Sequence, residues 1–323
     1  MELNIHSIIE KAKNGQSLTK EDAVSLLNVK NNSEELSRIF ALANKLTKKA
    51  FNNKGYVFAQ IGINAQPCSI NCKFCSMGAN HYVMESEWCK DAATVLSEVS
   101  DLVNANVDDI FLMTTADYSI QEFINLAKNA RKIIPQKIKL VANIGDFDLS
   151  VAYSLKEAGV TGIYHIHRLK EGIDTNVEPK VRIKTLDAIK EAGLELYYCV
   201  EPIGPEHTYE EIADEMERGR DYDVNVMAVM RRTPVGGTPL FDKGQISALE
   251  LTKIAAVTRL VSEPTRAMNA HEVTPATLIA RVNQLYAEYG ANPRDDKSNT
   301  ETGRGYSTDT IKKLLTDFEY ELN

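Results

Sequence analysis

The sequence lacks most of the features that mark membrane, secreted or nucleic-acid-binding proteins. None of its apolar runs reaches the roughly 18 residues that cross a bilayer, and its first residues show neither the basic nor the apolar segment of a signal peptide. Its five cysteines do not form the pattern of a disulfide framework. The net charge of −8 disfavours a surface for nucleic acid. We therefore expect a cytoplasmic protein without nucleic-acid or membrane partners.

Beyond Gly55, short apolar runs rich in β-forming residues alternate with longer amphipathic stretches. A strand followed each time by a helix predicts parallel strands joined by crossover helices. Eight such runs favour an α/β fold, a closed (β/α)8 TIM-type barrel. An open, partial (β/α)6 barrel is the alternative, because the last two runs are the weakest. The predicted strands are 56–63, 109–114, 138–144, 162–167, 194–200, 224–230, 266–270 and 285–289.

The whole chain is predicted to divide into three parts. Residues 1–52 are predicted to form an N-terminal helical extension, 53–290 the barrel, and 291–323 a polar C-terminal tail whose loop and final helix, at about 308–320, close the barrel. Gly159 and Gly193 directly follow predicted helices, where glycine commonly terminates them. The predicted crossover helices are 92–105, 120–132, 149–158, 181–192, 209–220, 248–261 and 275–282.

Three of the five cysteines fall within eight residues, directly after the first predicted strand. Cys68, Cys72 and Cys75 have the spacing C-x3-C-x2-C. A tetrahedral zinc site or a fully protein-ligated iron–sulfur cluster takes four protein ligands. Three thiolates therefore leave one coordination position open, which is a catalytic arrangement. A zinc site completed by Cys89 is the alternative, but the sequence has no second C-x2-C or H-x3-H pair; Cys89 and Cys199 are expected to behave as small apolar residues.

The stretch 68–75, CSINCKFC, resembles the cluster-binding loop of the radical S-adenosylmethionine (SAM) enzymes. Residues 182–194, 237–240 and 251–260 follow the biotin synthase-like branch of that superfamily, which includes biotin synthase, the [FeFe]-hydrogenase maturase and methylornithine synthase. The resemblance covers about residues 40–310. It implies that Cys68, Cys72 and Cys75 bind a [4Fe–4S] cluster whose fourth iron chelates SAM. An external reductant such as flavodoxin or ferredoxin then drives SAM cleavage to a 5′-deoxyadenosyl radical, and the oxygen-sensitive cluster implies an anaerobic setting.

The resemblance also predicts SAM-binding residues around the carboxyl ends of the strands. Phe74, between two of the cysteines, would pack near the adenine or shield the cluster. Thr114 and Thr115 stand where small residues receive the SAM amino group, although the family's Gly-Gly-Glu is absent. Arg168 would bind the SAM carboxylate as a bidentate fork. The remaining candidates at strand ends are Asn143, His167, Glu201 and Arg231, with Arg232 as the alternative to Arg231 and His271 or Glu272 facing the substrate.

Two histidines of the fourth strand leave an alternative open. His165 and His167 share one face of a strand with a two-residue period. That face is either the barrel lumen, where both imidazoles would approach the substrate, or the layer of helices.

The sequence departs from biotin synthase in one informative way. In the family that this chain resembles, biotin synthases hold a second cluster with cysteines on strands two, three and five and an arginine on strand seven. Here only Cys199 is present, and His271 stands at the strand-seven position. One thiolate cannot hold such a cluster, so we expect a different enzyme.

We therefore predict hydrogen abstraction from a small, carboxylated substrate, in cofactor or vitamin biosynthesis, by carbon–carbon bond formation or rearrangement. Sulfur insertion, as in biotin or lipoyl synthesis, is the alternative within the class. A metal-bearing structural or binding module is the alternative from another class.

Overall fold

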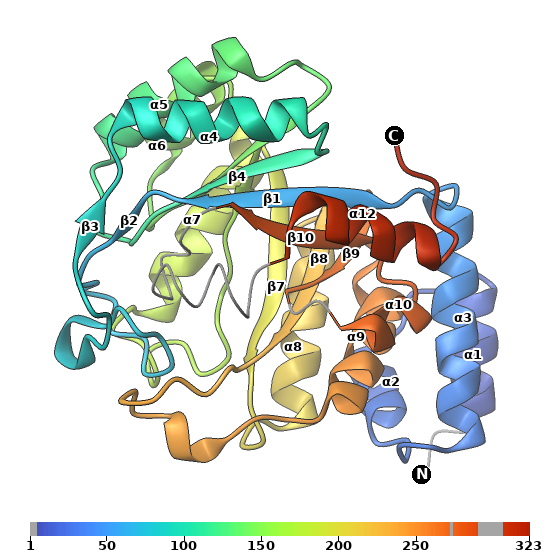
Figure 1. Cartoon of the computed structure of the whole chain (residues 1–323). Coiled ribbons are helices and arrows are strands. Elements are labelled where there is room, and N and C mark those ends of the chain that lie inside the picture. Colours follow the sequence, from blue (N-terminus) through green and yellow to red (C-terminus); the bar gives the residue numbers. More distant parts are fainter. Residues whose placement is uncertain (1–4, 272–273, 290–305) are drawn as a thin grey trace.

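A computed structural model describes residues 5–271, 274–289 and 306–323 and shows a closed barrel of eight parallel strands (Figure 1). The order around the barrel is β1-β10-β9-β8-β7-β6-β5-β4, with β4 paired back to β1. This confirms the predicted (β/α)8 barrel and excludes the six-stranded alternative. The strands are β1 Tyr56–Gly62, β4 Asp109–Met113, β5 Lys139–Asn143, β6 Gly162–Tyr164, β7 Glu195–Ile203, β8 Val226–Arg231, β9 Ala267–Ala270 and β10 Gln284–Tyr289.

Helices surround the barrel, and most of them begin with a side-chain cap, whereas α7 begins at Pro179 without one. The side chain of the residue before the helix accepts a hydrogen bond from a first-turn backbone N–H in α4, α5, α6, α8 and α9. Helix α7 ends at Gly193, whose φ of 64° suits glycine. The surrounding helices are α4 Ala92–Asn104, α5 Ile120–Ile133, α6 Leu149–Glu157, α7 Pro179–Ala192, α8 Tyr209–Asp221 and α9 Ala248–Ser262.

The N-terminal helices lie at the end of the barrel opposite the strands' carboxyl ends (Figure 1). They are α1 Ile5–Lys13, α2 Lys20–Leu27 and α3 Glu34–Ala50; α2 contacts α8 and α9, and α3 contacts α9. The short helix α10 Pro275–Ile279 contacts α9, and the final helix α12 Thr308–Asp317 packs on β10 and β1. The predicted tail loop at 291–305 lies outside the described residues. Among the helices of the described ranges, none is long and apolar enough to cross a membrane.

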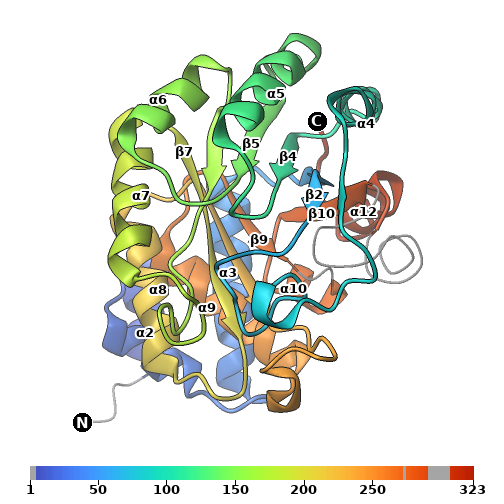
Figure 2. The same ribbon diagram turned by 90° about the vertical axis from the view of Figure 1, so that its left-hand side faces the viewer.

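Two strands end three residues away from their predicted ends, whereas the carboxyl ends of the other strands lie within one residue of the prediction. Strand β6 ends at Tyr164, three residues before the predicted end, whereas β7 continues to Ile203. Pairing of β7 with β8 shifts in register between Val200 and Ile203. An additional short antiparallel pair, β2 Asn64–Ala65 and β3 Trp88–Cys89, brackets the cysteine loop. Figure 1 shows the pair at the edge of the barrel, and Figure 2 faces that side of the molecule.

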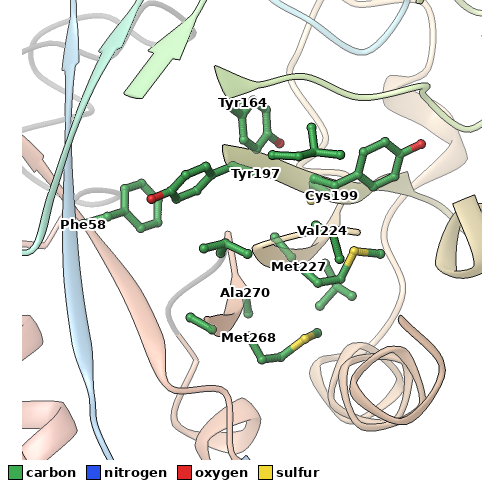
Figure 3. Packing of buried hydrophobic residues seen from close by; sticks show 14 of the residues in the cluster. Phe58, Tyr164, Tyr197, Cys199, Val224, Met227, Met268 and Ala270 are labelled. Atoms are coloured by element: carbon green, nitrogen blue, oxygen red, sulfur yellow. The ribbon is translucent and has the colours of Figure 1, made fainter. Parts of the chain in front are cut away.

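Aromatic side chains fill the middle of the barrel. Phe58 projects from β1 and Tyr197 from β7 toward one another (Figure 3). The ring of Phe111, on β4, lies 4.6 Å from that of Phe58 and 5.3 Å, edge-on, from that of Tyr197. Such offset and edge-on contacts are the favoured geometries for aromatic pairs. The rings therefore form a solid layer that separates the lower barrel from the rim where the strands end.

Below this layer, a buried ion pair joins the amino-terminal ends of the strands. Asp109 is completely buried and lies 2.6 and 2.8 Å from the two terminal nitrogens of Arg266, a bidentate arrangement. Gln284 donates a further hydrogen bond of 2.6 Å to Asp109, and Arg266 donates one of 2.9 Å to the Tyr197 hydroxyl. Strands β4, β7, β10 and the segment before β9 are thereby tied together at the barrel floor.

We predict that Arg266→Met lowers the free energy of unfolding by about 3–5 kcal/mol, because it leaves the Asp109 carboxylate buried without its cation. Urea denaturation followed by circular dichroism measures the change. Arg38→Met is the matched control, since Arg38 pairs with Glu34 on the exposed face of α3, where an ion pair contributes little. Equal, small effects of the two substitutions would contradict the structural role assigned to the floor.

Candidate active site

The three clustered cysteines lie on a compact loop between β2 and β3, at the carboxyl end of the barrel. The backbone N–H of Cys68 donates to the Met77 carbonyl at 2.7 Å, which closes the loop on itself. Asn71 adopts a φ of 49° and its side-chain amide donates to the Ser69 carbonyl. Asparagine is among the few residues that tolerate this left-handed conformation. The left-handed conformation of Asn71 turns the chain between Cys68 and Cys72.

Loops from other strands hold the cysteine loop in place. After β4, the Asp117 carboxylate accepts two hydrogen bonds of 2.6 Å from Ser69, one from the backbone and one from the hydroxyl. After β6, the carbonyl of Asp174 accepts from the Lys73 N–H at 2.9 Å. After β8, the Leu240 N–H donates to the Lys73 carbonyl at 3.1 Å. Three strand ends therefore fix the position of the cysteines over the barrel mouth.

His81 braces the loop from the inside. Its Nε2 lies 3.1 Å from the Cys72 carbonyl and 3.0 Å from the Cys75 carbonyl. The ring occupies the space beside Gly78, where an added Cβ would lie 2.3 Å from it. Gly78 is therefore the residue type that this packing requires. The contact orients the peptide groups of two cysteines at once.

The thiols are partly or fully enclosed. Cys72 is buried and Cys68 and Cys75 are half-buried. Burial raises the pKa of the Cys72 thiol to about 12, although the nearby Arg168 cation works in the opposite direction. Burial also raises the pKa of Cys68, against hydrogen bonds from the backbone of Ala116 and Ile70. The loop therefore keeps all three thiols at least partly out of solvent.

The donor set fits an iron–sulfur cluster better than a single ion. Four ligands on tetrahedral zinc, at 2.3 Å per sulfur, stand about 3.8 Å apart. Among the described residues, only one group of three potential metal ligands has all its ligand atoms within 4.8 Å of one another, and that group does not include Cys68, Cys72 or Cys75. The sulfurs of these three cysteines are therefore spaced more widely. Cys89 is exposed on β3, and its main charged neighbour is Glu122 rather than the cysteine loop. The residues present therefore suit three corners of a cluster.

Arg168 connects this loop to the barrel lumen. Burial acts to lower the pKa of Arg168, but the charges of Cys72, Glu171 and Glu201 raise it overall. The guanidinium Nε lies 3.7 Å from Glu201 Oε1. Glu201 is completely buried, and its other oxygen accepts a 2.8 Å hydrogen bond from the Tyr164 hydroxyl. A fixed cation thus stands between the cysteines and a carboxylate of the lumen.

His165 and His167 both face the helix layer, which decides the alternative left by the sequence. His165 is buried, with Nε2 3.2 Å from Asp146 Oδ1, and Arg182 of α7 lies 2.8 Å from the same carboxylate. His167 Nδ1 lies 2.8 Å from Glu215 Oε1 on α8. Tyr164, immediately before them, faces the lumen instead. The structure therefore does not bring His167 together with the cysteine loop.

The other residues predicted to bind SAM lie at several places around the barrel mouth. Asn143 lines the upper lumen cavity, and Phe74 and Cys75 line a smaller pocket between the cysteine loop and the ends of β7 and β8. Thr114 and Thr115 follow β4, and Thr115 is held by two hydrogen bonds with Asn64. The guanidinium of Arg231 donates to the Ile246 carbonyl at 2.7 Å. The lumen cavity is lined by Phe58, Gln60, Phe111, Met113, Asn143, Tyr164, Met230, His271, Tyr286 and Glu288.

Arg232, the alternative to Arg231, is occupied elsewhere. Its buried side chain binds both carboxylate oxygens of Glu206, and it also donates to the Gly244 carbonyl at 3.0 Å. Burial acts to raise the pKa of Glu206, but the hydrogen bond from Arg232 outweighs it and the pKa is lowered. Arg232 therefore organises the loops after β7 and β8. Glu272 lies outside the described residues.

Sequence reasoning missed several residues of this site. Asp117, His81 and Glu171 act by holding the cysteine loop or Arg168, and Tyr164 reaches the lumen carboxylate. The only sequence signals for them were the positions of Tyr164, Asp117 and Glu171 at or beyond strand ends and of His81 shortly after Cys75. None belongs to a short motif with a chemical meaning of its own.

Curated proteins with similar sequences are biotin synthases. That of Sulfurihydrogenibium sp. (strain YO3AOP1) is 26% identical over 266 residues, 79% of this chain and 78% of that protein. That of Clostridium acetobutylicum is 27% identical over 269 residues, 80% of each chain. That of Pelotomaculum thermopropionicum is 26% identical over 302 residues, 87% of this chain and 91% of that protein. No family model matches the chain.

Solved structures share the fold. HydG, a maturase of the [FeFe]-hydrogenase, superposes with a TM-score of 0.85 at 17% identity, over 100% of this chain and 76% of that one. Methylornithine synthase (PylB) superposes with a TM-score of 0.84 at 18% identity, over 98% and 97% of the two chains. At these identities the similarity establishes the closed barrel with its surrounding helices.

We predict that His81→Ala impairs assembly of the cysteine site, because the peptide groups of Cys72 and Cys75 lose their common partner. Iron and sulfide per chain after anaerobic reconstitution should fall to less than half of the wild-type values. Asn80→Ala, a change in the exposed neighbour of His81, is the control and should bind as much iron as wild type. Full iron incorporation by His81→Ala would rule out the bracing role.

We predict that His165 makes stability depend on pH. Burial lowers the pKa of His165, and the hydrogen bond with Asp146 only partly opposes this. The unfolded chain therefore takes up a proton near pH 6.5 while the folded chain does not, so stability is lost as pH falls below that value. Relative to His165→Gln, the free energy of unfolding of the wild type should decline between about pH 7 and pH 5. Parallel curves from urea denaturation would contradict this.

Proposed function

We propose that this chain, a radical SAM enzyme of the biotin synthase-like kind, abstracts a hydrogen atom from a small carboxylated substrate in the barrel lumen. Cys68, Cys72 and Cys75 are the residues that would hold its [4Fe–4S] cluster, leaving the fourth position for SAM. The chemistry supplied by the bound cluster is reductive cleavage of SAM to a 5′-deoxyadenosyl radical. The observation that carries the proposal is geometric: loops after the strands hold the three cysteines at the barrel mouth, and the Arg168 guanidinium lies 3.7 Å from Glu201 at the same end of the barrel.

The protein's own residues perform binding and enclosure. The Arg168 guanidinium suits a carboxylate of SAM or substrate at the boundary between cysteine loop and lumen. Phe74 and the apolar ends of β7 and β8 exclude water beside Cys75. Holding the reacting molecules in contact inside a dry cavity removes much of the entropic barrier and prevents side reactions of the radical.

The lumen favours a small polar molecule. The aromatic layer of Phe58, Phe111 and Tyr197 closes it below, so a ligand enters only to the depth of Asn143 and His271. Asn143, Gln60 and Glu288 offer amide and carboxylate groups along the wall, and Gln60 and Glu288 bond to each other at 2.7 Å. This combination matches the few well-placed polar groups on apolar walls that bind small substrates.

Carbon–carbon bond formation or rearrangement is the reaction class that we propose, in the biosynthesis of a cofactor or vitamin. Sulfur insertion is less well supported, because it requires a sulfur donor and the lumen contributes one cysteine, Cys199. A purely structural metal module is less well supported too, because a closed site would engage all coordination positions with protein ligands. An electron from flavodoxin, ferredoxin or a similar external reductant would start the reaction.

We predict that the reconstituted protein converts SAM to 5′-deoxyadenosine and methionine when reduced with dithionite under anaerobic conditions. Liquid chromatography with mass spectrometry measures both products. Cys72→Ala should abolish the reaction, because a buried cluster ligand is lost. Cys89→Ala should retain it, since Cys89 is exposed on β3 and its main charged neighbour is Glu122. No 5′-deoxyadenosine from protein with a full iron complement would overturn the proposed radical chemistry.

A further inference from the structure

Three potential metal ligands converge in the upper lumen, apart from the cysteine loop. One ligand atom each from Cys199, Glu201 and His271 lie within 4.8 Å of one another. Among the described residues, this is the only group of three histidine, cysteine or acidic side chains with that spacing. Cys199 and Glu201 are completely buried, and His271 is half-buried.

The barrel geometry explains the convergence. Cys199 and Glu201 are two residues apart on β7 and share the lumen face with Tyr197. Cys199 pairs in register with Ala228 of β8, and Ala228 pairs with Asn269 of β9, two residues before His271. The small side chain of Ala228 leaves the space between the two strands open. The thiol and the imidazole therefore approach each other across β8.

From this geometry we infer that Cys199, Glu201 and His271 bind one divalent transition-metal ion, of which zinc is the best match. Thiolate, imidazole and carboxylate are the three ligand types that zinc takes. Ligand atoms on tetrahedral zinc stand about 3.5 Å apart, so a movement of about 1 Å completes the site. Binding forms a zinc–sulfur bond and releases the Cys199 thiol proton to solvent.

Tyr164 is placed to orient two of the ligands. Its hydroxyl donates to Glu201 Oε2 at 2.8 Å and lies 3.3 Å from His271 Nδ1. Figure 3 shows Tyr164 on the strand next to that of Cys199. Hydrogen-bonding partners of this kind fix the orientation of metal ligands and strengthen binding.

The charge of the site leaves room for a substrate. Thiolate and carboxylate neutralise a divalent ion, and the Arg168 cation beside Glu201 then leaves one positive charge. Three protein ligands leave the fourth tetrahedral position open, as in catalytic rather than structural zinc sites. A carboxylate of a small substrate would supply both the missing ligand and the missing charge. This last step rests on the proposed function; the metal site itself does not.

Zinc content of the intact, cluster-loaded protein tests the inference. After anaerobic incubation with zinc chloride and desalting, we expect about one zinc per chain by elemental analysis, lost in Cys199→Ala and retained in Cys89→Ala. Tyr164→Phe should weaken zinc binding about tenfold. Either wild-type protein without stoichiometric zinc or full retention of zinc by Cys199→Ala would overturn the site.

A cobalt titration separates this site from the cluster cysteines. In a Cys68→Ala, Cys72→Ala, Cys75→Ala triple variant, Co²⁺ alone should produce a thiolate-to-cobalt charge-transfer band that disappears on adding Cys199→Ala. The band depends on a bound thiolate, and these variants cannot cleave SAM. Failure of the radical proposal therefore leaves the result unaffected. If the triple variant does not fold by circular dichroism, the zinc content of the intact protein decides alone.

Discussion

Closure of the eight-stranded barrel is the constraint on which the site depends. Strands in an open sheet stand about 4.8 Å apart, so β1 would lie about 14 Å from β6 on one side and β8 on the other. Closing the sheet brings the loops after β1, β4, β6 and β8 to one rim. Asp117, Asp174 and Leu240 can then all bind the cysteine loop. Each contact is weak alone, and together they define one position.

The buried charges near the rim fix the position of Arg168 and contribute little to the stability of the fold. Asp146, Glu171 and Arg182 form a chain of ion pairs behind Arg168, with Arg182 Nε 3.2 Å from Glu171 Oε2. Removing such groups from water costs about as much as their attraction returns. The chain holds the segment after β6 against α7, and Glu171 accepts the Arg168 backbone N–H. The stabilising energy comes from the apolar core, which leaves the rim charges to serve geometry.

The sequence predicted the features that depend on periodicity and on residue spacing. It did not predict which face of a strand points to the lumen, or which residues far apart in the sequence form contacts. Alternating strand and helix patterns located all eight strands, and C-x3-C-x2-C located the cysteine loop. The two-residue period placed His165 and His167 on one face but could not say which, because β6 ends at Tyr164 before a longer alternation sets the phase. Thr115 and Arg232 found partners in Asn64 and Glu206. Those contacts are products of the fold.

The aromatic layer of the barrel separates stability from chemistry. Below it, Asp109 and Arg266 tie the strands together. Above it, Arg168 lies beside Glu201, and Glu201 accepts a hydrogen bond from Tyr164, which lines the lumen cavity. Phe58, Phe111 and Tyr197 fill the space between these two regions. The same fold can therefore change the residues at its rim, and with them its substrate, without weakening the floor that keeps the barrel closed.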